Sequence, residues 1–232
     1  MTGKYIRRKL KKANSRIKSN SEKLRFRLKG FFISLFVSRR DFSVISNNCW
    51  GGWVYRILKM PYLSPTAGLF FMSGDYLKLV KNLHKYMDAK LEFIPAEESR
   101  YYEYLKKRDF HIYPIARLED IEVVFRHYKT NEEAAQKWYR RKERINYDNI
   151  ILKFSRMYGC TEKEMAEFAE LPFDNKILIN NRKDKKYDCE IYAPLPSDEY
   201  GIINDTQPFP GKVNIIKILN KKPVRYPDGG LK

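Results

Sequence analysis

Residues 41–52 read Asp-Phe-Ser-Val-Ile-Ser-Asn-Asn-Cys-Trp-Gly-Gly, and this stretch is the strongest indication of the fold class. An apolar, β-prone run over 42–45 is followed directly by a polar turn that ends in Gly51 and Gly52. The next residues, 53–58, predict the start of a helix. A strand, a glycine turn and a helix in succession place free backbone N–H groups at the carboxyl edge of a sheet, where α/β proteins usually bind phosphate or another anion.

Strands and helices alternate along the rest of the chain. Apolar runs predict strands at 42–45, 69–72, 121–128, 150–154 and 176–181, and helical spacing predicts helices at 53–58, 77–87, 131–144, 162 onward and 213–219. Thr161 and Glu164 form a capping-box pattern at the start of the fourth of these helices. The alternation predicts a three-layer α/β/α sandwich with a mostly parallel sheet. We expect one α/β domain over residues 41–232, less regular from about residue 183, behind an arm of residues 1–40.

Composition favours a globular protein in a reducing compartment. Hydrophobic residues make up 43% of the 232 residues, which is ample for a core. The three cysteines are far apart and include no CxxC pair, which argues against a disulfide framework and against a zinc site. No apolar run reaches the length of a transmembrane helix. We therefore expect a cytoplasmic protein.

The net charge of +18 is concentrated in the arm. Residues 1–40 carry 14 Lys/Arg and one acid, a net of +13, whereas the other 192 residues carry 32 basic and 27 acidic residues, a net of +5. The body is therefore an ordinary surface, and the excess charge belongs to its N-terminal extension.

The arm has the pattern of a basic amphipathic helix. Its apolar residues recur at spacings of three, four and seven: Ile6, Leu10, Ala13, Ile17, Leu24, Leu28, Phe31 and Leu35. One apolar stripe on a cationic helix fits an anionic membrane surface, with residues 4–36 in contact at the inner face of the cell membrane. Two alternatives remain: a solvated helix whose stripe packs on the body, and an arm that follows nucleic-acid phosphates.

Six motifs in order carry a family resemblance. They are Phe42–Gly52, Tyr62–Phe71, Asp75–Lys78, Tyr113–Val123, His127-Tyr128 and Lys137–Asn146. Over roughly residues 40–182 the chain resembles an uncharacterised bacterial family, a domain of unknown function found in exopolysaccharide and capsule loci. The resemblance implies an α/β fold and a role in polysaccharide biosynthesis, for which sugar transfer is the usual inference. Ala116 and Val124 depart from the pattern, since a glycine and a histidine are common at these positions in the family.

Candidate ligand-binding residues come first from the opening segment. Gly51 and Gly52 would present backbone amides to the diphosphate of a nucleotide sugar, and Asn47, Asn48 and Trp50 are typical sugar-binding groups. The alternative is a structural tight turn.

Cationic and polar residues elsewhere extend the candidate set. Arginine binds phosphate bidentately, so a diphosphate could be neutralised by Arg56, Arg140, Arg141 and Arg144, with Arg182 as a further candidate. A solvated helix end is the alternative for the three arginines near residue 142. Ser64 and Thr66 belong to one of the resembling motifs, and Asp75 is either a ligand-binding group or a helix cap.

Candidate catalytic residues are Asp120, Glu122 and His127, one of which would activate an acceptor hydroxyl. An acidic residue here, Glu119 included, could instead bind Mg²⁺ or Mn²⁺ near the diphosphate. No Asp-x-Asp motif is present there, so we assign no metal ligand and leave metal dependence open.

These observations lead to one functional hypothesis with alternatives. We expect a membrane-associated sugar transferase that uses a nucleotide-sugar donor and a lipid-linked glycan acceptor. The alternatives are a non-enzymatic nucleic-acid-binding protein that uses the basic arm, and an acyl or phosphoryl transferase acting on the same glycan. The near-neutral body makes nucleic acid the weaker partner.

Overall fold

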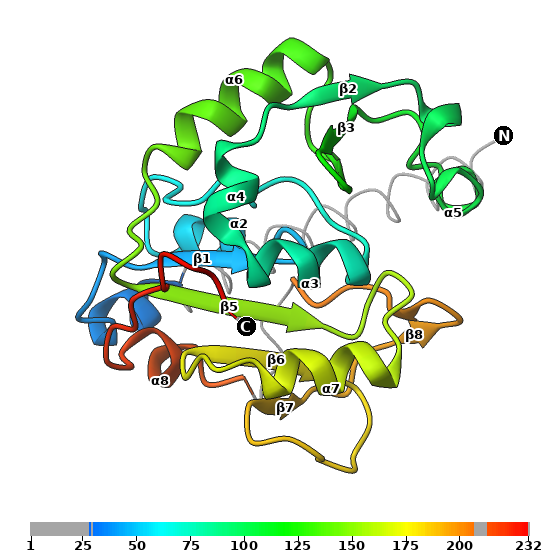
Figure 1. Ribbon diagram of the computed structural model, residues 1–232. Helices are drawn as coiled ribbons and strands as arrows, with labels where there is room; N and C mark the ends of the chain where they lie inside the picture. The colour runs from blue at the N-terminus through cyan, green and yellow to red at the C-terminus, as the bar shows by residue number, and fades with distance from the viewer. Residues whose placement is uncertain (1–27, 29, 207–212, 232) are drawn as a thin grey trace, which may run out of the picture.

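A parallel four-stranded sheet in the order β1-β5-β6-β7 forms the centre of the molecule (Figure 1). The computed structural model describes residues 28, 30–206 and 213–231. The elements in chain order are β1 (Ser43–Ser46), α2 (Trp50–Ile57), α3 (Ser73–Lys81), α4 (Leu83–Asp88), β2 (Glu92–Ile94), the 3-10 helix η1 (Ala96–Glu98), α5 (Tyr102–Lys107), β3 (Ile115–Leu118), β4 (Ile121–Val124), α6 (Asn131–Lys142), β5 (Ile150–Ser155), α7 (Glu162–Glu170), β6 (Lys176–Asn180), β7 (Glu190–Tyr192), β8 (Ser197–Asp198), β9 (Gly201–Ile202) and α8 (Ile215–Leu219).

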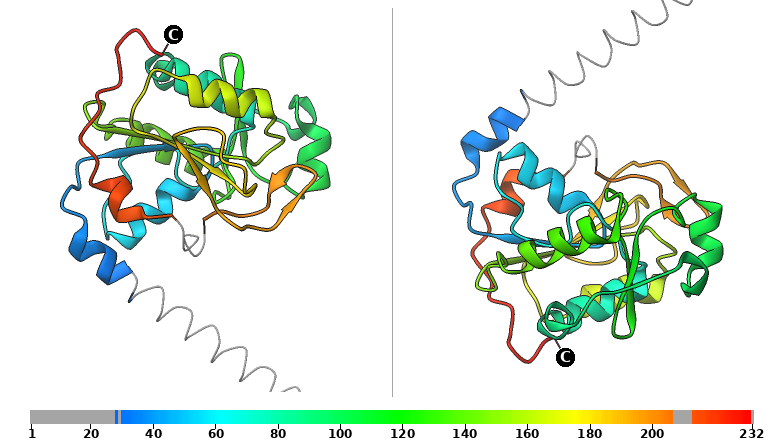
Figure 2. Two further views of the ribbon diagram at one scale, coloured as in Figure 1. Left: turned by 90° about the horizontal axis from the view of Figure 1, so that it is seen from below. Right: turned by 90° about the horizontal axis from the view of Figure 1, so that it is seen from above.

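The central sheet is covered by helices on both faces, as Figure 2 shows. All residues of β1 and β5 are buried, as expected for parallel strands between two helical layers. Alternate strand residues enter two different cores: Ile45 and Leu152 pack with α3, α4 and α7, whereas Val44 and Ile151 pack with α2 and α8. The predicted α/β sandwich with a mostly parallel sheet is therefore confirmed.

The strand predicted at 121–128 belongs to a different sheet. It is shorter, β4, and pairs antiparallel with β3, which pairs antiparallel with β2. The prediction of a regular strand at 69–72 is wrong, because this segment forms an isolated β-bridge between Phe70 and Val124 and no named strand. The Phe71 amide donates to Asn47 O at 3.1 Å, so this extended segment joins the small sheet to the end of β1.

Two predicted helices have different boundaries. The opening helix begins at Trp50, so Gly51 and Gly52 lie in its first turn rather than in a preceding loop. The helix predicted over 77–87 is two helices, α3 and α4, interrupted at Asn82, whose backbone is not helical. The capping box of Thr161 and Glu164 is confirmed, and α8 lies within the predicted 213–219.

The predicted arm helix lies mostly outside the described residues. Residues 28 and 30–36 are helical, and Ile33 and Val37 are buried against the core that contains α2 and α8. The Asn220 amide donates to Phe36 O at 2.7 Å, which ties this helix to the end of α8. Across the described part of the chain, no helix is both long enough and apolar enough to pass through a bilayer.

Candidate functional site

Two adjoining cavities open beyond the carboxyl end of β1. The first, of about 290 Å³, is lined by Cys49, Gly52, Trp53, Arg56, Tyr62, Ala67, Gly68, His127, Tyr128, Glu133, Lys137 and Arg141. The second, of about 270 Å³, is lined by Asn48, Cys49, Trp53, Arg126, His127, Met157, Tyr158, Ile203, Asn204 and Thr206. They share Cys49, Trp53 and His127, so these three residues lie at their junction. Sites for small ligands are typically concave and of this size or larger.

Arg141 is a buried cation in the wall of the first cavity. Its side chain is 8% exposed, donates to Ala67 O at 2.8 Å and to the Tyr128 hydroxyl, and lies 4.5 Å from the centre of the Tyr62 ring. All of these partners are neutral. A buried charge is normally paired with an opposite charge, so this arrangement leaves the positive charge of Arg141 open to an anion.

Three further cations that line the two cavities also have no ion pair among the described residues. Ion pairs neutralise many lysines and arginines elsewhere, but among the described residues none involves Arg56, Arg126, Lys137 or Arg141. The first cavity contains one acidic residue, Glu133. The two cavities together, called the cleft from here on, therefore form a concave surface with positive charge that no ion pair neutralises.

His127 lies at the junction of the cavities and is held by its backbone, which donates to Gly68 O at 3.0 Å. Partial burial, together with the positive charge of Arg126, lowers the pKa of His127 below its ordinary 6.5. The imidazole is therefore neutral near pH 7 and able to accept a proton.

Cys49, at the same junction, is not an activated nucleophile. Burial raises the pKa of its thiol to about 11, and the Sγ–Leu69 O distance of 3.6 Å is that of a weak hydrogen bond. A thiol that stays protonated at neutral pH reacts slowly.

The first amides of α2 are not free to bind an anion. Trp50 N donates to Asn48 Oδ1 at 3.0 Å, and Gly51 N donates to Ser46 Oγ at 3.3 Å. The prediction that Gly51 presents a free amide is therefore wrong. A Cβ on Gly51 would lie 3.1 Å from Val44 Cγ1, so this glycine permits close packing of α2 on β1.

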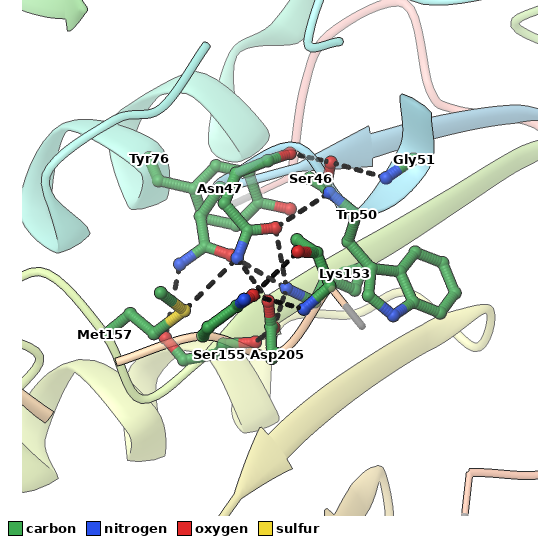
Figure 3. A network of polar contacts seen from close by, with 12 residues as sticks. Ser46, Asn47, Trp50, Gly51, Tyr76, Lys153, Ser155, Met157 and Asp205 are labelled. Carbon is green, nitrogen blue, oxygen red and sulfur yellow. Dashed lines mark hydrogen bonds and ion pairs between the residues drawn. The ribbon is translucent and has the colours of Figure 1, made fainter. Parts of the chain in front are cut away.

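A fully buried polar network, drawn in Figure 3, adjoins the second cavity through Asn48, which belongs to both. Lys153 Nζ forms an ion pair with Asp205 and donates to Asn47 Oδ1 at 3.3 Å and to Asn48 Oδ1 at 3.0 Å. Asp205 also accepts from Asn48 Nδ2 at 2.7 Å and from the Ser155 hydroxyl. Burial lowers the pKa of Lys153 while Asp205 acts in the opposite direction. The network holds Asn47 in the interior, where it lines neither of the two cavities, and leaves Asn48 at the edge of the second one.

Three other predicted ligand-binding residues are buried supports. Trp50 is fully buried beside Lys153, whose Nζ lies 6.0 Å from the indole centre. Thr66 Oγ1 donates to Val44 O at 3.2 Å and accepts from Ser46 N, and the Ser64 hydroxyl lies 2.9 Å from Thr66 Oγ1. These contacts fix the loop after α2 against β1 and place none of the three in the cavity walls.

The predicted carboxylates form a separate cluster at the start of β4. Asp75 Oδ2 accepts from Arg100 at 2.9 Å and from Glu122 N at 2.8 Å, and Glu122 Oε2 accepts from Ser99 at 2.6 Å. Burial raises the pKa of Asp75. The pKa of Asp120 is about 2, because Lys78 and Tyr86 donate to its carboxylate.

The structure therefore does not bring the three predicted catalytic residues together. Asp120 and Glu122 lie at the start of β4, whereas His127 follows the end of that strand. Arg140 and Arg144 are exposed and line neither cavity, and Arg182 forms an ion pair with Glu162. Of the predicted residues, the cleft collects Asn48, Gly52, Arg56, His127 and Arg141.

No metal site accompanies these groups. Throughout residues 28, 30–206 and 213–231, no three His, Cys, Asp or Glu side chains are placed to share an ion.

Several residues of the cleft were not predicted as site residues. Lys137 and Tyr128 belong to motifs with a family resemblance, and Arg126 directly precedes the predicted His127. Lys153 was also missed, although a lysine inside the apolar run Ile150–Phe154 is itself a signal, because charged residues are rare in buried parallel strands. Asp205 had no such signal, since it lies in an irregular segment far along the chain.

Comparisons with known proteins place the chain in a family. A family model described as a domain of unknown function, DUF1919, matches residues 20–212. An uncharacterised protein of Haemophilus influenzae is 31% identical to this chain over 156 residues, which cover 66% of this chain and 69% of that relative. The residues matched by the family model include all those that line the two cavities. The chain belongs to the DUF1919 family.

Proposed function

We propose that this protein is a sugar transferase of polysaccharide biosynthesis that uses a nucleotide-sugar donor and a lipid-linked glycan acceptor. The observation that carries the proposal is the set of unneutralised cations in the cleft, Arg56, Arg126, Lys137 and Arg141. A diphosphate supplies the negative charge that these groups lack, and arginine binds phosphate oxygens bidentately. The association with capsule and exopolysaccharide synthesis rests on the resemblance of the sequence motifs.

Each group of the cleft has a role in this proposal. Arg56, Lys137 and Arg141 hold the donor diphosphate in the first cavity, beside the aromatic rings of Trp53 and Tyr62. His127 takes the proton from the acceptor hydroxyl, whose oxygen bonds to the anomeric carbon as the bond from that carbon to the diphosphate breaks. The arginines stabilise the charge that develops on the departing nucleoside diphosphate.

The direct test is release of a nucleoside diphosphate from a panel of nucleotide sugars, with membrane extract as the source of acceptor. Arg141→Gln and Arg56→Gln are each expected to lower kcat/KM by about tenfold or more, as expected for loss of a charged hydrogen bond. Arg140→Gln is the matched control, because Arg140 is the neighbouring arginine on α6 and lines neither cavity.

Two outcomes would contradict the proposal. One is no release from any donor by a protein whose circular dichroism shows that it is folded. The other is equal activity of the Arg56, Arg140 and Arg141 variants, which would mean that the cleft does not hold the donor. Because Arg56 is exposed, its replacement tests the charge without disturbing the fold.

We also propose that the N-terminal segment binds an anionic membrane surface, where a lipid-linked acceptor lies. Large apolar side chains on one short helix are 50% to 62% exposed: Leu28, Phe31, Phe32, Leu35 and Phe36. Exposed apolar side chains concentrated in this way are uncommon on a monomer. Their sequence neighbours are the basic residues of the arm, and positive charge beside an apolar face complements anionic lipid.

Flotation with vesicles that contain phosphatidylglycerol tests this second proposal. The double change Phe32→Asp and Phe36→Asp is expected to abolish flotation of the full chain, whereas Ile112→Asp changes an equally exposed residue elsewhere and leaves it intact. Unchanged flotation of the double variant would refute membrane contact through this face. A shift from dimer to monomer in that variant, without any vesicle binding by the parent, would instead identify a second copy of the chain as the occupant.

A further inference from the structure

The cleft continues beyond the second cavity into a smaller one. This aromatic cavity, of about 140 Å³, is lined by Tyr104, Arg108, Phe110, Arg126, Met157, Tyr158, Tyr200, Ile202 and Ile203. It shares Arg126, Met157, Tyr158 and Ile203 with the second cavity and no residue with the first. The three cavities therefore form a series, with the cationic one and the aromatic one at opposite ends.

Aromatic rings from separate parts of the chain meet at this end. Tyr104 on α5 and Tyr200 in the β8–β9 turn have ring centres 4.8 Å apart, and Phe110 lies 6.4 Å from Tyr104. Tyr158 is fixed behind them by stacking on Phe70 at 4.5 Å. Tyr104 and Tyr200 remain partly exposed. Arg108 lies 5.8 Å and 5.2 Å from their ring centres, and Lys107 lies 5.3 Å from that of Tyr200, so a ligand would meet the parts of the rings that these side chains leave uncovered.

The charge in the aromatic cavity differs from that in the first. Arg108 is neutralised by Asp198. Arg126 lines both the second cavity and the aromatic cavity, and its guanidinium is 4.9 Å from the centre of the Phe110 ring. Among the described residues, the aromatic cavity thus has one cation without an ion pair, Arg126, and is otherwise lined by neutral side chains and the Arg108–Asp198 pair.

We infer that the aromatic cavity is a subsite for an uncharged hexopyranose ring of the glycan acceptor. Aromatic faces pack well against the C–H groups of a saturated ring, while phenol and guanidinium groups can bond its hydroxyls. The rings of Tyr104 and Tyr200 meet at 78°, which makes a corner rather than a parallel slot that could sandwich a planar nucleobase.

The binding of a sugar in the aromatic cavity does not depend on the proposed function. The assignment of that sugar to the glycan acceptor rests on it. His127 lies at the junction of the first and second cavities, so a donor in the first and an acceptor that extends from the second into the aromatic cavity would meet beside it.

Saturation-transfer NMR on the full chain with methyl glycosides of glucose, galactose, mannose and N-acetylglucosamine tests this inference. At least one glycoside is expected to bind, and Tyr200→Leu and Tyr104→Leu are each expected to weaken it about tenfold. Tyr200→Phe keeps the ring and is expected to retain most of the binding. Tyr102→Leu is the matched control on α5, since Tyr102 does not line the cavity.

Parallel titration with nucleoside diphosphates separates this inference from the proposed function. One outcome is that the parent protein binds a glycoside but no nucleoside diphosphate, and that Tyr200→Leu abolishes the glycoside binding. This result would support the sugar subsite and refute the proposed nucleotide-sugar donor. No glycoside binding to the parent protein at millimolar concentration would overturn the subsite. So would binding of a free nucleoside that disappears in the Tyr200→Leu variant, since the cavity would then hold a base.

Discussion

At the scale of single residues, the position of His127 beside Arg126 determines when its imidazole can accept a proton. Burial and the neighbouring positive charge both disfavour the imidazolium ion, so the pKa of His127 lies below 6.5. If His127 is the base, kcat/KM should rise with pH below 6.5 and be level around neutrality.

Removal of the charge of Arg126 is expected to move that rise to higher pH. In the Arg126→Gln variant the imidazolium ion loses a repulsive neighbour, so the pKa of His127 increases. An NMR titration of the His127 ring protons measures the change directly, and the pH profile of kcat/KM should follow it. Lys129→Gln is the control, because this exposed lysine lines neither cavity. An unchanged titration midpoint in Arg126→Gln would show that the charge does not act on His127.

Single residues were only partly predictable as members of the site. Arg56, His127 and Arg141 were expected because cations and a histidine suit phosphate and proton transfer, and all three line the first cavity. Asn47 was expected for its amide, but its amide groups bond Lys153 and the Ser155 carbonyl. A partner more than 100 positions away decides whether such a side chain faces a ligand or the interior, and local sequence does not contain that information.

At the scale of elements, the contact between α2 and β1 depends on the missing side chain of Gly51. Alanine has a higher helix propensity than glycine by about 1 kcal/mol, which alone would stabilise α2. An added Cβ would, however, lie 3.1–3.3 Å from Val44 and Ser46, with no flexible group able to move away.

The Gly51→Ala change is therefore expected to lower the free energy of unfolding by about 1–3 kcal/mol through overpacking. Gly74→Ala, on α3, is the matched control, because its Cβ would meet only the end of the flexible Glu164 side chain at 3.2 Å. That variant should be neutral or slightly stabilised. Urea denaturation of both proteins gives the comparison, and equal stabilities would refute the packing role of Gly51.

Elements with local signals were predicted well. β1, β5, β6 and α7 have apolar runs or a capping box in their own sequence. The break at Asn82 had no local signal, since it is stabilised by the Tyr226 hydroxyl, which accepts from Leu83 N and donates to Val80 O, both at 2.9 Å. Likewise, β4 is antiparallel because it pairs with β3. The alternation of apolar residues within β4 is compatible with a place in either sheet, so it did not predict this pairing.

At the scale of the whole molecule, the C-terminal segment links the two helical layers. After α8 on one face, Val224 O accepts from Ile150 N at 3.1 Å at the sheet, and Leu231 N then donates to Lys81 O at 2.7 Å on the opposite face. The path around the sheet is visible as the red trace in Figures 1 and 2. Tyr226 is fully buried between these two contacts.

Tyr226→Phe is expected to lower the free energy of unfolding by about 1–3 kcal/mol, because it leaves the buried Leu83 amide and Val80 carbonyl without this partner. Tyr102→Phe, at the surface of α5, should change stability by less than about 0.5 kcal/mol. Thermal or urea unfolding measures both values. A Tyr226→Phe protein as stable as the control would mean that the terminal segment does not fasten the two layers.

The buried pair of Lys153 and Asp205 also determines how late in synthesis this protein can adopt its final structure. A ribosome delivers Lys153 within the central strand well before it delivers the carboxylate that neutralises it, 52 residues later. Until then, closing the sandwich would trap an uncompensated ammonium group, which costs several kcal/mol. The final packing of β5 is therefore expected to form only after Asp205 has left the ribosome.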